Sequence, residues 1–114
     1  MVSHRLENYL RTYRKHSSLT QEEVAFLLGC KKGIFVSRYE KRRRLPPLET
    51  ALTYEAVFGV PIAELFAGLR QKIENHVAKR RLELKSKLQA KVGKGSAAQI
   101  TAHKLRWLGD RETA

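Results

Sequence analysis

Residues that stop helices recur at short intervals through the first 68 residues, and they limit how long any helix there can be. Gly29, Pro46-Pro47, Gly59 and Pro61 separate stretches in which apolar residues recur at helical spacing. Glycine readily adopts the left-handed conformation that ends many helices, and proline cannot continue a helix because it has no N–H to donate. No alternating strand pattern of useful length occurs. The expected fold class is therefore all-α, built from short helices.

Five short helices are expected within residues 1–68. Thr20 to Glu23 matches a capping box, in which each side chain accepts from the other residue's backbone N–H at a helix start. This second helix ends at Gly29, and the third runs from near Lys32 to close to Lys41. Pro61 suits the opening of the fifth. The apolar residues that define the five helices are Leu6, Tyr9, Leu10, Tyr13, Val24, Ala25, Leu27, Leu28, Val36, Tyr39, Leu48, Ala51, Leu52, Val57, Phe58, Ile62, Leu65 and Phe66.

Residues 69–114 differ in composition and are expected to form a basic helical tail after the domain of residues 1–68. A long helix is expected over about 69–92, then a flexible break over 93–96 and a short helix over about 97–108 with a frayed end beyond it. Steps of eleven residues within the long helix hint at a non-heptad helix pairing. Its apolar residues are Leu69, Ile73, Val77, Leu84, Leu88 and Val92, interrupted by Arg80, Arg81 and Lys91.

Positive charge is concentrated in two places along the chain. The 23 Lys and Arg outnumber 11 Asp and Glu, a net charge of +12, of which residues 69–114 carry +8. Within the first domain, Lys31 to Arg44 holds seven bases and one acid, Glu40. Such a patch attracts phosphate through counterion release, which favours nucleic acid as the partner. The alternative is a solvated surface whose lysines maintain solubility.

Several classes of protein are disfavoured by the same sequence. The sequence has no run of about 18 apolar residues, so a membrane span is not expected. The N-terminus lacks the apolar stretch of a secretory signal. Cys30 has no partner cysteine for a disulfide, which fits a reducing cytoplasm, and it is expected to fill a small core site. No cofactor site, catalytic set or phosphate loop is found, so an enzyme is not expected. No metal site is expected either, because the histidines are far apart, at His4, His16, His76 and His103.

Several pieces of residues 4–68, in order and at near-regular spacing, resemble the Cro/repressor-type (XRE-like) helix-turn-helix family of bacterial and phage regulators. These pieces are Leu19-Thr20-Gln21-Glu22-Glu23-Val24-Ala25, Leu28-Gly29, Val36-Ser37-Arg38-Tyr39-Glu40, Pro46-Pro47-Leu48-Glu49-Thr50-Ala51-Leu52 and Phe58-Gly59-Val60-Pro61-Ile62-Ala63-Glu64-Leu65-Phe66. The resemblance implies a five-helix, lambda-repressor-like domain whose third helix enters the major groove of DNA.

The resemblance also implies a role for individual residues. Gln21 is expected to bond a phosphate, Ala25 to let two helices cross closely, and Arg38 to contact a guanine edge. Arg14 and Glu40 are expected to pair and to tie the first helix to the end of the third. Phe35 suits a thymine methyl and Ser37 a backbone oxygen. The DNA-contacting set is Gln21, Lys31, Lys32, Gly33, Ile34, Phe35, Ser37 and Arg38, with Lys41, Arg42, Arg43 and Arg44 mostly on phosphate.

Three features depart from the family pattern. One extra residue lies between Gly29 and Glu40, so the turn must absorb it, and base reading at Gly33 and Ile34 can shift by one position. We expect Gly33 to supply a positive φ in this lengthened turn. Pro47 stands where a serine-like cap is usual. Glu55 falls at a small core position, so either the fourth helix is rotated or Glu55 pairs with a base such as Arg42.

The resulting interpretation is a regulator that binds double-stranded DNA in a sequence-specific way, most simply a repressor acting by occupancy, in the cytoplasm at the nucleoid. A homodimer joined through residues 69–114 is expected, because a single domain of this size rarely gives enough specificity. Trp107 is expected to pack on the main body or on a second subunit. Two alternatives remain: an antitoxin whose tail masks a toxin, and a basic structural or RNA-associated protein.

Overall fold

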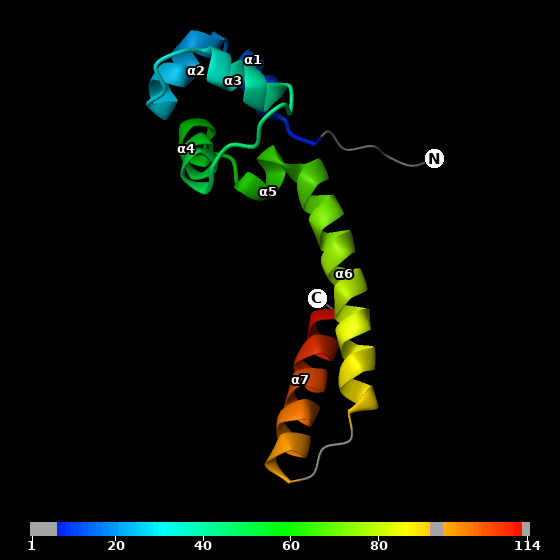
Figure 1. Ribbon diagram of the computed structural model, residues 1–114. Coiled ribbons are helices and arrows are strands. Elements are labelled where there is room, and N and C mark those ends of the chain that lie inside the picture. The colour runs from blue at the N-terminus through cyan, green and yellow to red at the C-terminus, as the bar shows by residue number, and fades with distance from the viewer. Residues whose placement is uncertain (1–6, 92–94, 113–114) are drawn as a thin grey trace, which may run out of the picture. The chain divides into compact units, whose positions relative to one another are not determined.

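The computed structural model describes residues 7–91 and 95–112, in which every regular element is a helix, and the all-α expectation is confirmed (Figure 1). The chain divides into an N-terminal unit, Met1–Gln71, and a C-terminal unit, Lys72–Ala114. The helices are α1 (Leu10–His16), α2 (Gln21–Leu28), α3 (Ile34–Glu40), α4 (Leu48–Phe58), α5 (Ile62–Leu65), α6 (Ala67–Ala90) and α7 (Ser96–Glu112). Within the described residues, no helix has both the length and the apolar character needed to cross a bilayer.

The start of α2 and the ends of α2 and α4 are marked by local signals that can be seen in the sequence. The capping box at the start of α2 is confirmed, with Thr20 Oγ1 accepting from the Glu23 N–H and Glu23 Oε1 accepting from the Thr20 N–H. These hydrogen bonds lower the pKa of the Glu23 carboxyl. Gly29 and Gly59 end α2 and α4 in the left-handed conformation, at φ 77° and 65°.

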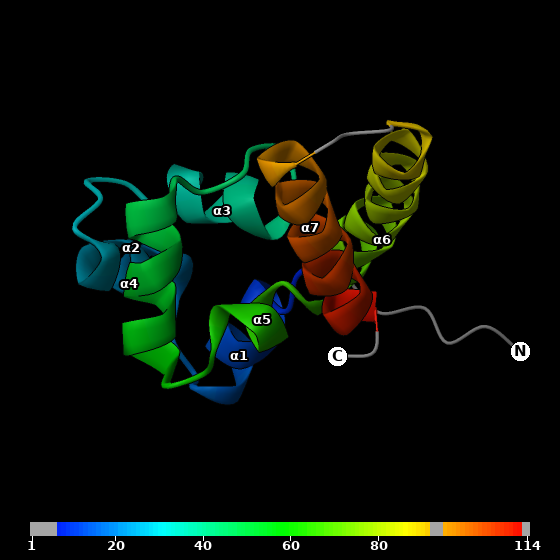
Figure 2. The same ribbon diagram turned by 90° about the horizontal axis from the view of Figure 1, so that it is seen from below.

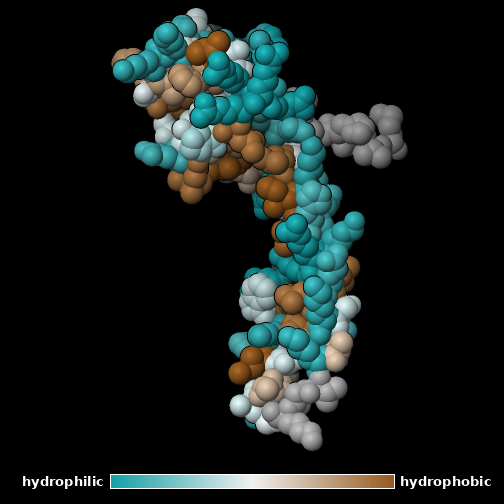
Figure 3. Space-filling view, in the orientation of Figure 1, coloured by the Kyte–Doolittle hydropathy of each residue, from teal (hydrophilic) through white to brown (hydrophobic). Residues whose placement is uncertain are grey.

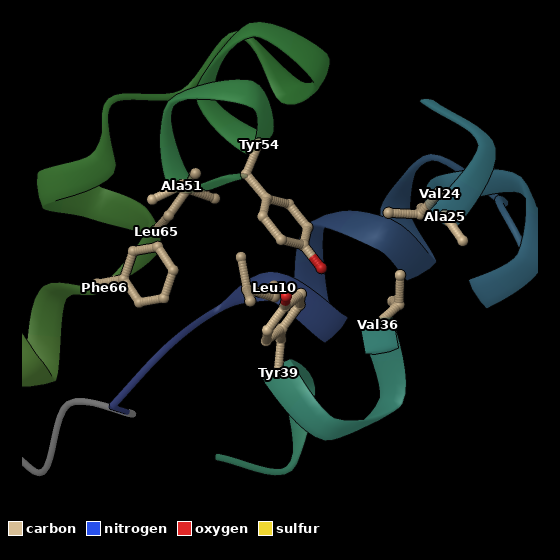
Figure 4. Packing of buried hydrophobic residues seen from close by; sticks show 9 residues of the cluster. All are labelled: Leu10, Val24, Ala25, Val36, Tyr39, Ala51, Tyr54, Leu65 and Phe66. Carbon is tan, nitrogen blue, oxygen red and sulfur yellow. The ribbon is translucent and has the colours of Figure 1, made fainter. Parts of the chain in front are cut away.

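The core of the N-terminal unit lies where α1 to α5 surround a common centre, as the view from below shows (Figure 2). Nine side chains fill it, and Tyr54 of α4 is the largest of those that are fully buried (Figure 4). The Tyr54 ring stacks on Phe58 at a centroid distance of 6.1 Å and meets Tyr39 edge-on at 6.3 Å. The nine residues are Leu10, Val24, Ala25, Val36, Tyr39, Ala51, Tyr54, Leu65 and Phe66.

The helices largely follow the sequence expectations, with one difference in the face that α4 buries. The spans of α2 and α4 agree with the predicted ends, and α3 buries Val36 and Tyr39 as expected. On α4, however, Leu48 is 73% and Leu52 49% exposed, while Tyr54 is buried. The aromatic ring fills the centre between α1 and α3, and this turns the leucines of α4 outward. Leu6, expected on the first helix, lies outside the described residues.

Two expectations for individual residues are wrong. Gly33 has φ −65°, an ordinary helical value, so the turn does not use it for a positive φ. Glu55 does not pair with Arg42; its Oε1 accepts a hydrogen bond from the Ile62 N–H at 2.8 Å. The first N–H groups of a helix have no partner within that helix. Glu55 therefore satisfies the start of α5, which the preceding Pro61 cannot cap with a side chain.

In the C-terminal unit, α7 runs antiparallel to the part of α6 beyond Lys72 and lies beside it (Figure 1). A groove of about 330 Å³ runs between the two helices and is lined mainly by apolar side chains. Its lining residues are Leu84, Leu88, His103, Lys104, Trp107 and Leu108. Of the large apolar residues described in this unit, only Leu88 and Leu108 are buried.

The two tail helices differ from the sequence expectation at their ends. α6 spans Ala67–Ala90, whereas residues 69–92 were expected. α7 continues to Glu112, so the expected frayed end is wrong for residues 109–112, and Gly109 lies within the helix. The break expected at 93–96 falls partly outside the described residues, and Gly95 within it is left-handed at φ 65°. Val92 also lies outside them.

The hydroxyl of Tyr54 is buried in the core of the N-terminal unit. Among the described residues this buried oxygen has no hydrogen-bond partner, and burial raises the pKa of Tyr54, with Glu40 adding to the shift. Replacing Tyr54 with Phe removes an unsatisfied polar group and should stabilise the unit by up to about 1 kcal/mol, whereas Tyr54→Ala should cost about 3–5 kcal/mol. Urea unfolding of the full chain measures both changes.

The same substitution should alter the response to alkali. The unfolded chain ionises its tyrosines at about pH 10, while folded Tyr54 keeps its proton to higher pH, so stability should fall as the pH rises above about 10. Part of that loss should be missing in Tyr54→Phe. An equally steep alkaline loss in both proteins would contradict this account of the buried hydroxyl.

Candidate nucleic-acid interface

The basic stretch from Lys31 to Arg44 includes α3 and both of its flanks. Its exposed side chains carry more net positive charge than the stretch as a whole, because its one acid is buried. All seven of its lysines and arginines are exposed. Its one acid, Glu40, is turned inward and its side chain is only 3% exposed. Hydrophilic side chains cover the side of the N-terminal unit that carries α3, while hydrophobic ones gather over α4 and α5 (Figure 3). The outward bases are Lys31, Lys32, Arg38, Lys41, Arg42, Arg43 and Arg44.

The buried carboxylate of Glu40 joins α3 to the two preceding helices. Arg14 of α1 donates from Nε to Oε2 at 2.6 Å and from Nη2 to Oε1 at 3.0 Å, a bidentate ion pair. Gln21 at the start of α2 donates from Nε2 to Oε1 at 3.2 Å. The hydrogen bonds to Glu40 raise the pKa of the Arg14 guanidinium. Such geometry is what a buried charge requires, because its removal from water is otherwise costly.

Two further hydrogen bonds fix the ends of α3. At its C-terminal end, Asn8 donates from Nδ2 to the carbonyl of Tyr39 at 3.0 Å, while Asn8 Oδ1 accepts from the Leu10 N–H at the start of α1. At its N-terminal end, Glu22 Oε1 accepts from the Gly33 N–H at 3.0 Å. The bonds to Asn8, Glu22 and the Glu40 pair hold α3 along its full length, so its outward face has a defined orientation.

The chain leaves α3 through a left-handed arginine. The Arg43 N–H bonds the carbonyl of Arg38 and the Arg42 N–H bonds that of Tyr39, the pattern of a Schellman motif, with Arg42 at φ 62°. This position usually holds glycine, since a side chain there costs about 1–2 kcal/mol. The Arg42 guanidinium lies 3.7 Å from a Glu7 carboxylate oxygen in an exposed pair, which contributes little stability.

Comparison with known proteins agrees with this geometry. The model of a helix-turn-helix family matches residues 10–65, which run from the start of α1 to the end of α5. Residues 10–65 therefore form a helix-turn-helix domain of the kind that this family model describes. It is also 36% identical over 80 residues to the cryptic phage CTXphi transcriptional repressor RstR of Vibrio cholerae. That alignment covers 70% of this chain and 65% of the relative, so the chain spans less than two thirds of its length. No solved structure matches the chain.

In this helix-turn-helix, α2 and α3 are joined by the turn of residues 29–33. Ala25 is buried at 1% exposure where α2 meets α3, and half-buried Cys30 packs against the core beside the turn. The Cys30 N–H closes the end of α2 by bonding the carbonyl of Ala25 at 2.8 Å. The extra residue of the turn is therefore accommodated without loss of the helix-end motif.

The residues expected to contact DNA fall into two groups. Ile34 and Arg38 are exposed on α3, and the Arg38 guanidinium carbon lies 5.9 Å from the centre of the Phe35 ring. By contrast, Phe35 packs against the core and Gly33 is buried under Glu22. Ser37 is half-buried. The surface available for reading bases is therefore narrower than the sequence suggested, because the start of α3 is turned toward α2.

Sequence reasoning missed three residues that position α3: Asn8, Glu22 and Tyr54. A polar residue before a helix, as at Asn8, is a known capping signal that was available. Glu22 stands beside Glu23, and the capping box explains the carboxylate of Glu23 alone. Tyr54 could have been found from the apolar spacing of α4 had its ring been counted as apolar. Within residues 7–91 and 95–111, no three His, Cys, Asp or Glu side chains gather where they could hold a metal ion.

Proposed function

We propose that this protein is a sequence-specific DNA-binding transcriptional repressor that acts by occupying its operator at the nucleoid. The observation that carries the proposal is the surface of residues 31–44, on α3 and its flanks, which presents seven outward bases while its one acid is buried in the ion pair with Arg14. A helix fixed in this way keeps a constant geometry toward the major groove, which base reading requires. The similarity to a phage transcriptional repressor favours repression.

The exposed residues divide by the contacts they suit. Arg38, which is exposed on α3, suits a bidentate contact to a guanine edge, and exposed Ile34 suits a thymine methyl. Half-buried Ser37 suits a backbone oxygen. Gln21 has one amide N–H left for a phosphate after bonding Glu40. The remaining bases, which suit phosphate and set affinity and register, are Lys31, Lys32, Lys41, Arg42, Arg43 and Arg44.

The first experiment is selection from random duplex DNA with the full-length protein at about 0.15 M salt, followed by sequencing. A repressor of this kind should enrich a short inverted repeat with half-sites about one helical turn apart, ~34 Å. Retention without enrichment, lost as salt rises, would indicate non-specific phosphate binding. That outcome would overturn the proposed function and favour a basic structural or RNA-associated protein.

Two arginines should separate base reading from phosphate contact. Arg38→Ala should lower affinity for the selected site by about 1–3 kcal/mol and relax the preference at one base pair. Arg43→Ala should weaken binding to all sequences alike and reduce the slope of log K against log salt by about 1. Fluorescence anisotropy with the selected site and a scrambled duplex measures both. An unchanged preference in Arg38→Ala would mean that the reading face of α3 lies elsewhere.

The left-handed residues at two helix ends give a test that separates folding from binding. Arg42→Gly should relieve backbone strain and raise the free energy of unfolding by up to about 1 kcal/mol, yet weaken DNA binding because a phosphate contact is lost. Ser18→Gly is the matched control, since Ser18 ends α1 at φ 59° through the same motif and far from α3 in sequence. It should gain similar stability with unchanged DNA binding. Equal binding by Arg42→Gly and wild type would remove Arg42 from the interface.

We further propose that two copies associate through the C-terminal unit. The described part of the α6–α7 hairpin buries only Leu88 and Leu108, which is too small a core for independent stability. Trp107 stays 51% exposed in the groove and is covered on one side by the Arg111 guanidinium at 5.0 Å. A second copy would bury this apolar surface and place two domains on an inverted repeat. The exposed apolar side chains of this surface are Leu84 and Trp107 in the groove, Ile73 and Val77 on the same face of α6 as Leu84, and Ile100 two turns before Trp107 on α7.

Two leucines, two positions apart on α6, test this association. Leu84 lines the groove and is 46% exposed, whereas Leu82 is 57% exposed and points about 200° away around the helix. In sedimentation experiments, Leu84→Gln should shift the wild-type dimer toward monomer, and Leu82→Gln should leave it a dimer. A monomeric wild type at all concentrations would overturn the association and assign the groove to a different protein, as in an antitoxin.

A further inference from the structure

The recognition helix α3 begins without a capping side chain of its own. Its N-cap residue, Gly33, has no side chain, and the exposed N-terminal N–H groups of a helix require acceptors. The acceptor comes instead from eleven residues earlier, where Glu22 Oε1 receives the Gly33 N–H at 3.0 Å. A carboxylate at this position also interacts favourably with the positive end of the helix dipole. One side chain of α2 thus completes the start of α3.

The Glu22 carboxylate lies close to the Cα atom of Gly33, in space that a side chain at this position would occupy. Gly33 has a φ of −65°, which suits any residue, so backbone freedom does not explain the glycine. A Cβ atom placed there would lie 2.5 Å from Glu22 Oε1, 2.9 Å from its carboxyl carbon and 3.2 Å from the Glu22 backbone nitrogen. The two distances under 3.0 Å are shorter than real Cβ atoms show, and both are to the end of the Glu22 side chain. A side chain at position 33 would therefore displace the Glu22 carboxylate from the Gly33 N–H.

We infer that Glu22 is a positioning residue for DNA recognition, which sets the register of the start of α3 against α2 and thereby determines what the helix reads. The assignment rests on the proposed function. Glu40, held by Arg14 and Gln21, fixes the far end of α3, six residues beyond Ile34. Val36 and Tyr39 pack in the core and hold the middle of α3, so its first turn, which follows the lengthened turn, is the part left to be fixed. Glu22 fixes this first turn and aligns Ile34 and Arg38 together.

The test is a selection experiment on full-length variants, combined with binding to the wild-type site and to a scrambled duplex. Glu22→Ala should reduce the ratio of specific to non-specific affinity by at least about tenfold and alter the selected motif. Glu22→Gln, which keeps an acceptor oxygen, should retain most of the ratio. Glu23→Ala is the matched control: it removes the neighbouring carboxylate that starts α2, so it should lower the thermal midpoint with the motif unchanged.

A double-mutant cycle ties the effect to the contact with Gly33. Gly33→Ala alone should displace the Glu22 side chain and reduce the specificity ratio as Glu22→Ala does. In the Glu22→Ala background, Gly33→Ala should add little further loss, because the two closest atoms are gone. Additive effects, or an unaltered motif in Glu22→Ala, would overturn the assignment and leave the proposed function intact. A wild type that selects no motif would overturn both.

Discussion

The bidentate pair between Arg14 and Glu40 is the interaction on which the arrangement of the first three helices depends. The carboxylate is almost completely buried, and without its three hydrogen bonds from α1 and α2 it would strongly destabilise the fold. The pair also has an electrostatic consequence at the surface. It turns the one acid of residues 31–44 inward, so the exposed charges of that stretch are all positive.

Helix ends in the N-terminal unit are satisfied in two ways, and only one of them is visible in sequence. The capping box at Thr20 and the glycine ends of α2 and α4 depend on residues within the same turn, so local patterns predicted them. Glu22 and Glu55 instead serve the starts of α3 and α5 from neighbouring helices, eleven and seven residues away. Such contacts depend on how helices pack, and no local pattern encodes them.

The same distinction explains which parts of the candidate site the sequence predicted. The family resemblance implied the pair of Arg14 and Glu40, because a resemblance carries tertiary information, and the count of charges from Lys31 to Arg44 indicated the basic surface. The inward turn of Phe35 and the burial of Gly33 could not be foreseen, since the extra residue in the turn changes how α3 starts. Tyr54 shows the complementary case, in which one large ring decides which face of α4 is buried.

The C-terminal unit adds a constraint of a different kind. A helix in a two-helix hairpin has one neighbour, so most of its apolar face stays in contact with water unless a further surface covers it. Folding of this unit and association of two copies should therefore be linked, with each stabilising the other by mass action. Binding to an inverted repeat would then depend more steeply on protein concentration than binding by preformed dimers. Under the proposed function, that linkage would let the amount of protein itself set when the operator is occupied.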